Sequence, residues 1–251
     1  MEHVYTTSYK VTTLHADCFS RCRPSGLLRF AQDAAGEHCQ ILGTDWDSMA
    51  KKNFFWAVIR QRMEITRLPK EGETVTVKTW PMPTTRVAYP RATEGFDAEG
   101  NSLFKVMSLW VIMDMDSRAM VLPGKSGVLV DGTLRGNELA VPGSLAIKNL
   151  TNSSSRSVLY SDLDRNGHMN NTRYLEWIGD LLPSAFHRNH TPKEFTVCYH
   201  SEALEGESLD IHYEMKEDGL LQVDAWREND ASTGNHHRVF VAQVQYETDI
   251  L

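Results

Sequence analysis

The chain has 251 residues, a length that fits one large domain or two domains of roughly 120 residues each. Its 41% hydrophobic and 24% charged residues are ordinary for a globular protein, and its formal charge of -7 argues against general nucleic-acid binding, which uses basic surfaces. No apolar run approaches the roughly 20 residues of a membrane span, and residues 1–15 lack the zones of a signal peptide. We therefore expect a cytoplasmic protein with no membrane span.

The cysteines give no sign of a metal site. Cys18, Cys22, Cys39 and Cys198 form no C-x-x-C pair, and a cytosolic setting favours free thiols. Cys18 and Cys22 could be combined with His15, but a second ligand pair is missing. We expect neither a metal nor a cofactor.

The first half of the chain reads as one long helix among strands. The helix is predicted over 24–42, because Pro24 suits a first turn and Gly43 suits a stop. Alternating or apolar runs bounded by turn residues predict strands at 4–14, 54–65, 74–80, 85–96 and 102–115.

The second half repeats this order. It begins at 155–160, its helix is predicted over 170–182, and strands are expected near 194–200, 208–215, 220–228 and 237–248. Gly, Pro, Asn and Ser accumulate between the halves, which indicates a linker. One helix followed by meandering strands, twice over, predicts an α+β architecture in which a long helix packs on an antiparallel sheet.

The segment 161–174, SDLDRNGHMNNTRY, carries the most chemistry. Asp164, Asn166 and His168 would share one side if the backbone is extended. Asn170 suits a helix cap, and the helix after it has an apolar face formed by Tyr174, Trp177, Ile178 and Leu181. Such residues taken alone are more often a turn and a cap than an active site. Beside a helix N-terminus, however, an acid, an amide and an imidazole can polarise a carbonyl and activate water.

The whole segment resembles the signature D-L-D-x-N-x-H-x-N-N-x-x-Y of the acyl-[acyl-carrier-protein] thioesterases. The runs at 51–60 (KKNFFWAVIR) and 72–80 (GETVTVKTW) are similar to first-domain strands of that family. The resemblance implies a tandem (double) hotdog fold. It assigns an N-terminal hotdog with the acyl-chain pocket to residues 1–130, a linker to 131–154, and a catalytic C-terminal hotdog to 155–251.

The resemblance also supplies a second acid, Glu202, which the residues alone would not single out. Thr196, Cys198, His200 and Glu202 are expected on one face of a strand. Plant members carry a cysteine just after this acid, where this chain has Ala203, so a thiolate at that position is excluded. Cys198 is interpreted as a buried structural thiol.

The two halves differ in their reactive residues. An ungapped alignment of 16–23 with 161–168 matches Asp17 to Asp162 and places Phe19, Arg21 and Arg23 opposite Asp164, Asn166 and His168. We therefore expect the first half to have lost the reactive set.

The implied activity is hydrolysis of fatty acyl-[acyl-carrier-protein] by Asp164, Asn166, His168 and Glu202, which releases free fatty acid. Glu202 and His168 would activate water, while Asp164 either stabilises the site or attacks first to give an anhydride. An acyl-CoA thioesterase, a 2-enoyl thioester hydratase and a non-catalytic acyl-binding protein stay open as alternatives. The acidic carrier protein would need a basic patch, and a homodimer of the whole chain also stays open. Candidates for the patch are Lys51, Lys52, Arg60, Arg62, Arg67 and Lys70.

Overall fold

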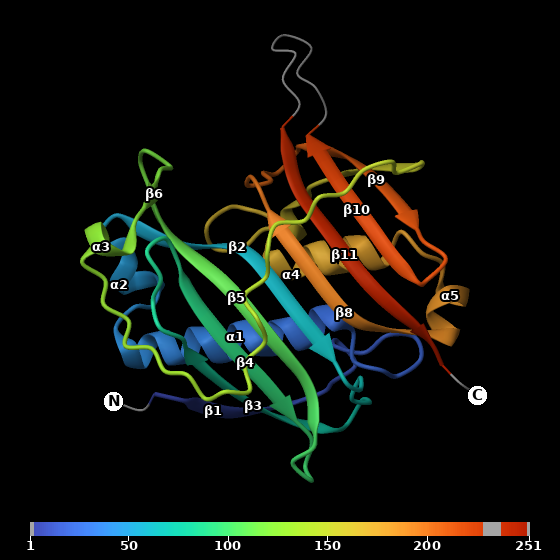
Figure 1. The fold of residues 1–251 in the computed structure, drawn as a ribbon, viewed down its shortest axis with the longest axis horizontal. Coiled ribbons are helices and arrows are strands. Elements are labelled where there is room, and N and C mark those ends of the chain that lie inside the picture. The colour runs from blue at the N-terminus through green and yellow to red at the C-terminus, as the bar shows by residue number, and fades with distance from the viewer. Residues whose placement is uncertain (1–2, 228–236, 250–251) are drawn as a thin grey trace. The chain divides into compact units, whose positions relative to one another are not determined.

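The computed structural model describes residues 3–227 and 237–249, and it divides the chain into two compact units, Met1–Pro142 and Gly143–Leu251. Figure 1 shows the helices and strands of both units. Most of the loop predicted between the last two strands, residues 228–236, lies outside the described residues.

The first unit contains an antiparallel sheet in the order β1-β3-β4-β5-β2, with the short strand β6 paired to β5 (Figure 1). The strands are β1 (Tyr5–Lys10), β2 (Phe54–Ile65), β3 (Thr74–Pro81), β4 (Tyr89–Phe96), β5 (Ser102–Asp114) and β6 (Met120–Val121). A strand forms at each of the five predicted positions, although the first strand is shorter than expected and β6 was not predicted.

The long helix α1 (Pro24–Leu42) packs on this sheet, and both of its ends follow the prediction. Pro24 occupies the first helical position, and Gly43 takes the left-handed conformation that ends the helix, with φ 67°. Its buried face includes Leu27 and Phe30, and the Phe30 ring stacks on Tyr9 of β1 at 5.0 Å. Two short helices, α2 (Trp46–Ala50) and α3 (Pro123–Ser126), were not predicted, because each spans little more than one turn.

The second unit contains an antiparallel sheet in the order β8-β11-β10-β9-β7. Its strands are β7 (Asn152–Ser157), β8 (His190–Tyr199), β9 (Ser208–Met215), β10 (Leu220–Arg227) and β11 (Arg238–Thr248). Its helical segments are the 3-10 turn η1 (Tyr160–Asp162), α4 (Asn171–Gly179) and α5 (Ser184–Asn189). The ring of Tyr174 on α4 meets Tyr199 of β8 and Phe240 of β11, each at 5.0 Å, so α4 packs on this sheet.

Several boundaries differ from the prediction for local reasons. The strand predicted from 85 begins at Tyr89, because Thr85 forms a turn in which its hydroxyl accepts the N–H groups of Val87 and Ala88. The second helix ends at Gly179 rather than at 182, and the chain turns there before α5. β7 begins at Asn152, inside the predicted linker, because its polar residues pair with β9 although they lack an apolar pattern. The α+β class itself is confirmed.

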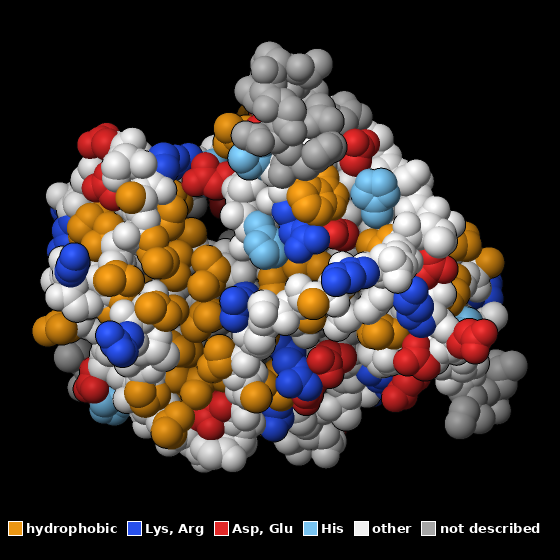
Figure 2. Space-filling model, turned by 45° about the horizontal axis from the view of Figure 1, so that its top comes forward, with side chains coloured by type: hydrophobic (Ala, Val, Ile, Leu, Met, Phe, Trp, Pro, Cys, Tyr) orange, Lys and Arg blue, Asp and Glu red, His pale blue; other side chains and the backbone are white. Residues whose placement is uncertain are grey.

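The surface of the molecule mixes both charge signs with apolar side chains. Figure 2 shows a broad group of hydrophobic side chains with only scattered Lys and Arg residues among them. Large hydrophobic residues exposed in the first unit include Val87, Met120, Leu129 and Leu134. Among the residues described, no helix is both long and apolar enough to cross a membrane.

Candidate active site

The three polar residues of the signature segment lie on a tight turn, so the extended backbone on which they would share one side does not form. The backbone N–H of Asp164 donates to the carbonyl of His168 at 2.7 Å, and the N–H of Gly167 donates to the carbonyl of Asp164 at 3.0 Å. Gly167 has φ 75°, a left-handed conformation that glycine adopts without strain. Leu163 and Met169 pair where the chain enters and leaves the turn. Because residues 163–169 carry three of the four candidate catalytic residues, we call them the catalytic loop.

Asp164 directs its carboxylate back onto this loop. Its Oδ1 accepts the backbone N–H of Asn166 at 2.7 Å and that of His168 at 3.4 Å. Asp164 and Asn166 are half-buried, whereas His168 is buried. The acid, the amide and the imidazole therefore share one short loop. The carboxylate of Asp164 accepts hydrogen bonds from the backbone N–H groups of Asn166 and His168.

Glu202 lies against His168. Its Oε2 is 3.0 Å from Nε2 of His168, and the two side chains are 33% and 11% exposed. Glu202 is not on a strand as expected, because β8 ends at Tyr199 and Glu202 follows in a loop. A carboxylate bonded to an imidazole that water can still reach is an arrangement suited to general base catalysis.

Backbone pairing brings the two segments together. The N–H of Met169 donates to the carbonyl of Ala203 at 2.9 Å, and His168 forms a bridge with Leu204. We call residues 200–207 the acid loop. The contact between His168 and Glu202 thus follows from pairing between segments more than 30 positions apart.

Arg227, the last residue of β10, holds the acid loop in place. Its Nη2 donates to the carbonyl of Glu202 at 2.6 Å, and its Nε lies 3.0 Å from Oε1 of Glu207. Oε2 of Glu207 in turn accepts the N–H of Leu204 at 2.9 Å. Arg227 and Glu207 were not predicted as site residues, because nothing in the local sequence pattern links a strand end to a loop 25 positions earlier.

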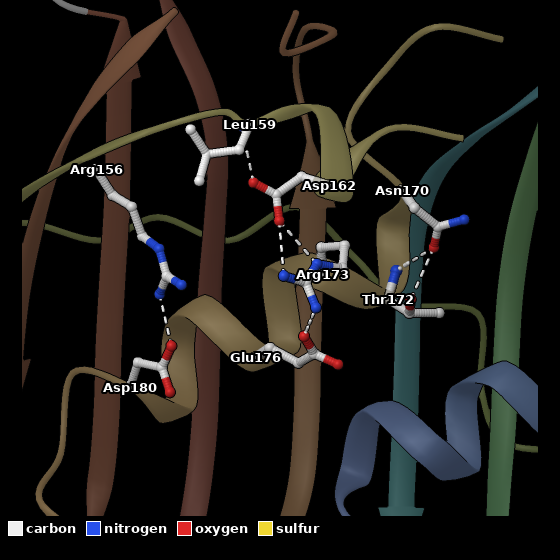
Figure 3. A network of polar contacts seen from close by, with 8 residues as sticks. All are labelled: Arg156, Leu159, Asp162, Asn170, Thr172, Arg173, Glu176 and Asp180. Atoms are coloured by element: carbon white, nitrogen blue, oxygen red, sulfur yellow. Dashed lines mark hydrogen bonds and ion pairs between the residues drawn. The ribbon is translucent and has the colours of Figure 1, made fainter. Parts of the chain in front are cut away.

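A buried ion pair secures the start of the catalytic loop (Figure 3). Asp162 is 3% exposed, and its Oδ1 accepts from Nε of Arg173 at 2.8 Å while Oδ2 accepts the N–H of Leu159 at 3.0 Å. Arg173 also pairs with Glu176 one turn further along α4. These contacts connect the segment before the loop with the helix after it.

The N-terminus of α4 follows the catalytic loop directly. Asn170 is its cap, as predicted, and its Oδ1 accepts the N–H of Thr172 at 2.9 Å (Figure 3). Tyr174 of α4 is buried. Its burial, and to a smaller extent the negative charge of Asp164, raise the pKa of the Tyr174 hydroxyl. The positive end of the helix dipole therefore adjoins the loop that carries Asn166 and His168.

The cysteine of β8, Cys198, is interpreted as a structural thiol. Cys198 is buried, and its Sγ contacts the carbonyl of Gly143 at 3.5 Å, in agreement with a structural thiol. Ala203 is also fully buried. Within 3–227 and 237–249, no group of three or more His, Cys, Asp or Glu side chains is arranged to hold a metal ion.

Fold and site together define a tandem hotdog protein with a polar centre in its second unit. Residues 2–122 match the acyl-ACP thioesterase N-terminal domain, and residues 147–249 match the acyl-ACP thioesterase C-terminal domain. The chain belongs to the acyl-ACP thioesterase family.

Plant proteins are among the curated relatives. A palmitoyl-acyl carrier protein thioesterase of Gossypium hirsutum is 25% identical over 214 residues, which cover 79% of this chain and 52% of the relative. An acyl-[acyl-carrier-protein] hydrolase of Cuphea viscosissima is 23% identical over 233 residues, which cover 84% of this chain and 52% of the relative. The chain thus spans about half the length of these relatives.

Solved structures share the fold over the whole chain. An acyl-ACP thioesterase from Bacteroides thetaiotaomicron has a TM-score of 0.84 at 22% identity and covers 98% of both chains. A 12:0-ACP thioesterase from Umbellularia californica has a TM-score of 0.83 at 19% identity and covers 99% of both chains. These matches confirm the tandem hotdog fold.

Proposed function

We propose that this protein is a cytoplasmic thioester hydrolase that releases free fatty acid from fatty acyl-[acyl-carrier-protein] and so terminates chain elongation. Membership of the family supports the reaction class and the substrate. The single observation on which the site depends is the 3.0 Å contact between His168 and Glu202 beside the N-terminus of α4.

In the proposed reaction, Glu202 orients His168 and shares the proton that the imidazole removes from water. The water oxygen adds to the thioester carbonyl carbon. Negative charge develops on the carbonyl oxygen, where the Asn166 amide and the first N–H groups of α4 stabilise it. Breakdown of the tetrahedral intermediate breaks the C–S bond, and the proton passes to the departing pantetheine thiolate.

We propose that residues 155–251, with the first residues of β7, form the catalytic hotdog, that residues 1–130 form the hotdog with the acyl pocket, and that the residues between them form the linker. Leu27, Leu28 and Phe30 are buried on α1 and supply apolar surface to the hotdog of residues 1–130. The family resemblance supports this division of labour.

The acyl carrier protein is the proposed partner. Ion pairs within the chain reduce the number of candidate residues for its basic docking patch. Arg62 is paired with Glu64 and Arg67 with Glu73, each at 2.9 Å, so their charges are compensated. Arg60 is half-buried and donates to the carbonyl of Pro142 at 3.3 Å, and it stays as a candidate together with the exposed Lys51, Lys52 and Lys70. A homodimer of the whole chain also stays a prediction.

The test is an assay of thiol release from acyl-carrier-protein substrates over a series of chain lengths. We expect His168→Ala and Glu202→Gln to lower kcat about 10²–10⁴-fold, the usual contribution of a general base. Glu205→Gln is the matched control, because Glu205 is an exposed acid of the same loop. It should keep the wild-type rate.

Each alternative has its own outcome in this assay. Release from coenzyme A esters alone would make the protein an acyl-CoA thioesterase. Reversible water addition without thiol release would make it a hydratase. If the protein binds acyl chains without releasing thiol, and His168→Ala and Glu202→Gln bind them as the wild type does, it is an acyl-binding protein.

A further inference from the structure

The catalytic loop of the second unit has a counterpart in the first unit with the same backbone hydrogen bonds. In residues 16–22, the N–H of Asp17 donates to the carbonyl of Arg21 at 2.7 Å, and the N–H of Ser20 donates to the carbonyl of Asp17 at 3.0 Å. The equivalent bonds from Asp164 and Gly167 have the same two lengths. Ser20, like Gly167, is left-handed, with φ 60°.

The two acids make the same bonds. Oδ1 of Asp17 accepts the N–H groups of the residues two and four positions later, Phe19 and Arg21, each at 2.9 Å. Oδ1 of Asp164 accepts the corresponding N–H groups of Asn166 and His168. Asp17 therefore corresponds to Asp164 and not to Asp162, so the ungapped alignment of the sequence was wrong by two positions.

The partner segments correspond as well. Cys22 donates its N–H to the carbonyl of Pro69 at 2.7 Å, as Met169 does to that of Ala203 at 2.9 Å. Leu68, which precedes Pro69, thus stands where the second unit has Glu202. The first unit has Phe19, Arg21 and Leu68 in place of Asn166, His168 and Glu202. It keeps the acid and lacks the amide, the imidazole and the second acid. Oδ1 of Asp17 holds the turn, whereas its Oδ2 pairs with Arg21 at 3.1 Å.

We infer that Asp164 is a positioning residue, and that its carboxylate acts by holding the backbone beneath Asn166 and His168 rather than by attacking the thioester. A unit without amide, imidazole or second acid keeps the same carboxylate on the same two N–H groups, so the turn itself requires it. This inference rests on the proposed function and selects its route: water attacks directly, and no anhydride forms.

Substitution of the acid separates the two roles. In Asp164→Asn, the amide oxygen can accept the same two N–H groups but the side chain cannot attack a carbonyl. We expect Asp164→Asn to recover kcat to within about tenfold of wild type, with KM unchanged, whereas Asp164→Ala loses roughly 10²-fold or more. Asp17→Ala and Asp17→Asn are the matched controls, and their thermal midpoints should show the same order as those of the Asp164 pair.

Isotope labelling gives a readout that does not depend on how the variants fold. In a single turnover of wild-type protein in ¹⁸O-water, the label should enter the fatty acid and not the Asp164 carboxylate. Label in Asp164, or an Asp164→Asn protein that is as stable as wild type and as inactive as Asp164→Ala, would overturn the inference. Failure of the proposed function would look different, because wild-type protein would then release no thiol from acyl-carrier-protein substrates.

Discussion

Removal of Arg173 should destabilise the second unit through the charge that it leaves behind. Asp162 is almost fully buried, and Arg173 reaches it with Nε and Nη2, each at 2.8 Å (Figure 3). In Arg173→Met, the N–H of Leu159 would stay as a partner of Asp162, but no cation would compensate the carboxylate.

Loss of one partner of a buried pair costs about 3–5 kcal/mol, mainly because the other charge is left desolvated. The Arg173 side chain is 24% exposed and that of Asp162 is 4% exposed, so water reaches one side of the pair. We therefore expect the lower end of the range, about 3 kcal/mol in the free energy of unfolding.

Urea unfolding followed by circular dichroism measures this loss. The slope of the transition should stay the same while its midpoint falls. The double variant Asp162→Asn, Arg173→Met should be more stable than Arg173→Met alone, because its neutral amide replaces the uncompensated charge.

A matched control comes from a second Arg–Asp pair of the same unit. Arg156 and Asp180 are 2.6 Å apart, but their side chains are 38% and 64% exposed. Asp180→Asn should cost under about 1 kcal/mol, as exposed ion pairs do. Equal, small losses in Arg173→Met and Asp180→Asn would refute the reasoning, since burial would then not distinguish the pairs.

Two further predictions concern local features. Asn170→Ala removes the cap of α4 and should cost about 1 kcal/mol in urea unfolding. An unchanged free energy of unfolding in Asn170→Ala would mean that other groups accept the N–H groups of the first turn of α4. Burial raises the pKa of the Cys22 thiol to about 12 from an ordinary value of 9.0. The unfolded chain therefore releases this proton first, and stability should fall above pH 9 by up to about 1.4 kcal/mol per pH unit. Cys22→Ala should lack this part of the alkaline loss, and an identical pH dependence in both proteins would contradict the assignment.

The sequence by itself determined the features that depend on neighbouring residues. Pro24 and Gly43 mark both ends of α1, because one residue suits a first helical turn and the other a left-handed stop. Asn170 marks the start of α4 for a similar reason. The signature segment identified the family, and the family resemblance supplied the proposed reaction class and the four candidate residues.

Only the tertiary structure decided how those residues meet. The spacing of Asp164, Asn166 and His168 fits an extended strand as well as the observed turn, and the turn is held by bonds of the loop to itself and to the acid loop. Glu202 reaches His168 because Met169 pairs with Ala203, and Arg227 supports the carbonyl of Glu202 from a distant strand. Hydrogen bonds between residues far apart in the chain leave no local pattern. For the same reason, the hydrogen bonds of the two carboxylates show that Asp17 is equivalent to Asp164, whereas the ungapped sequence alignment does not.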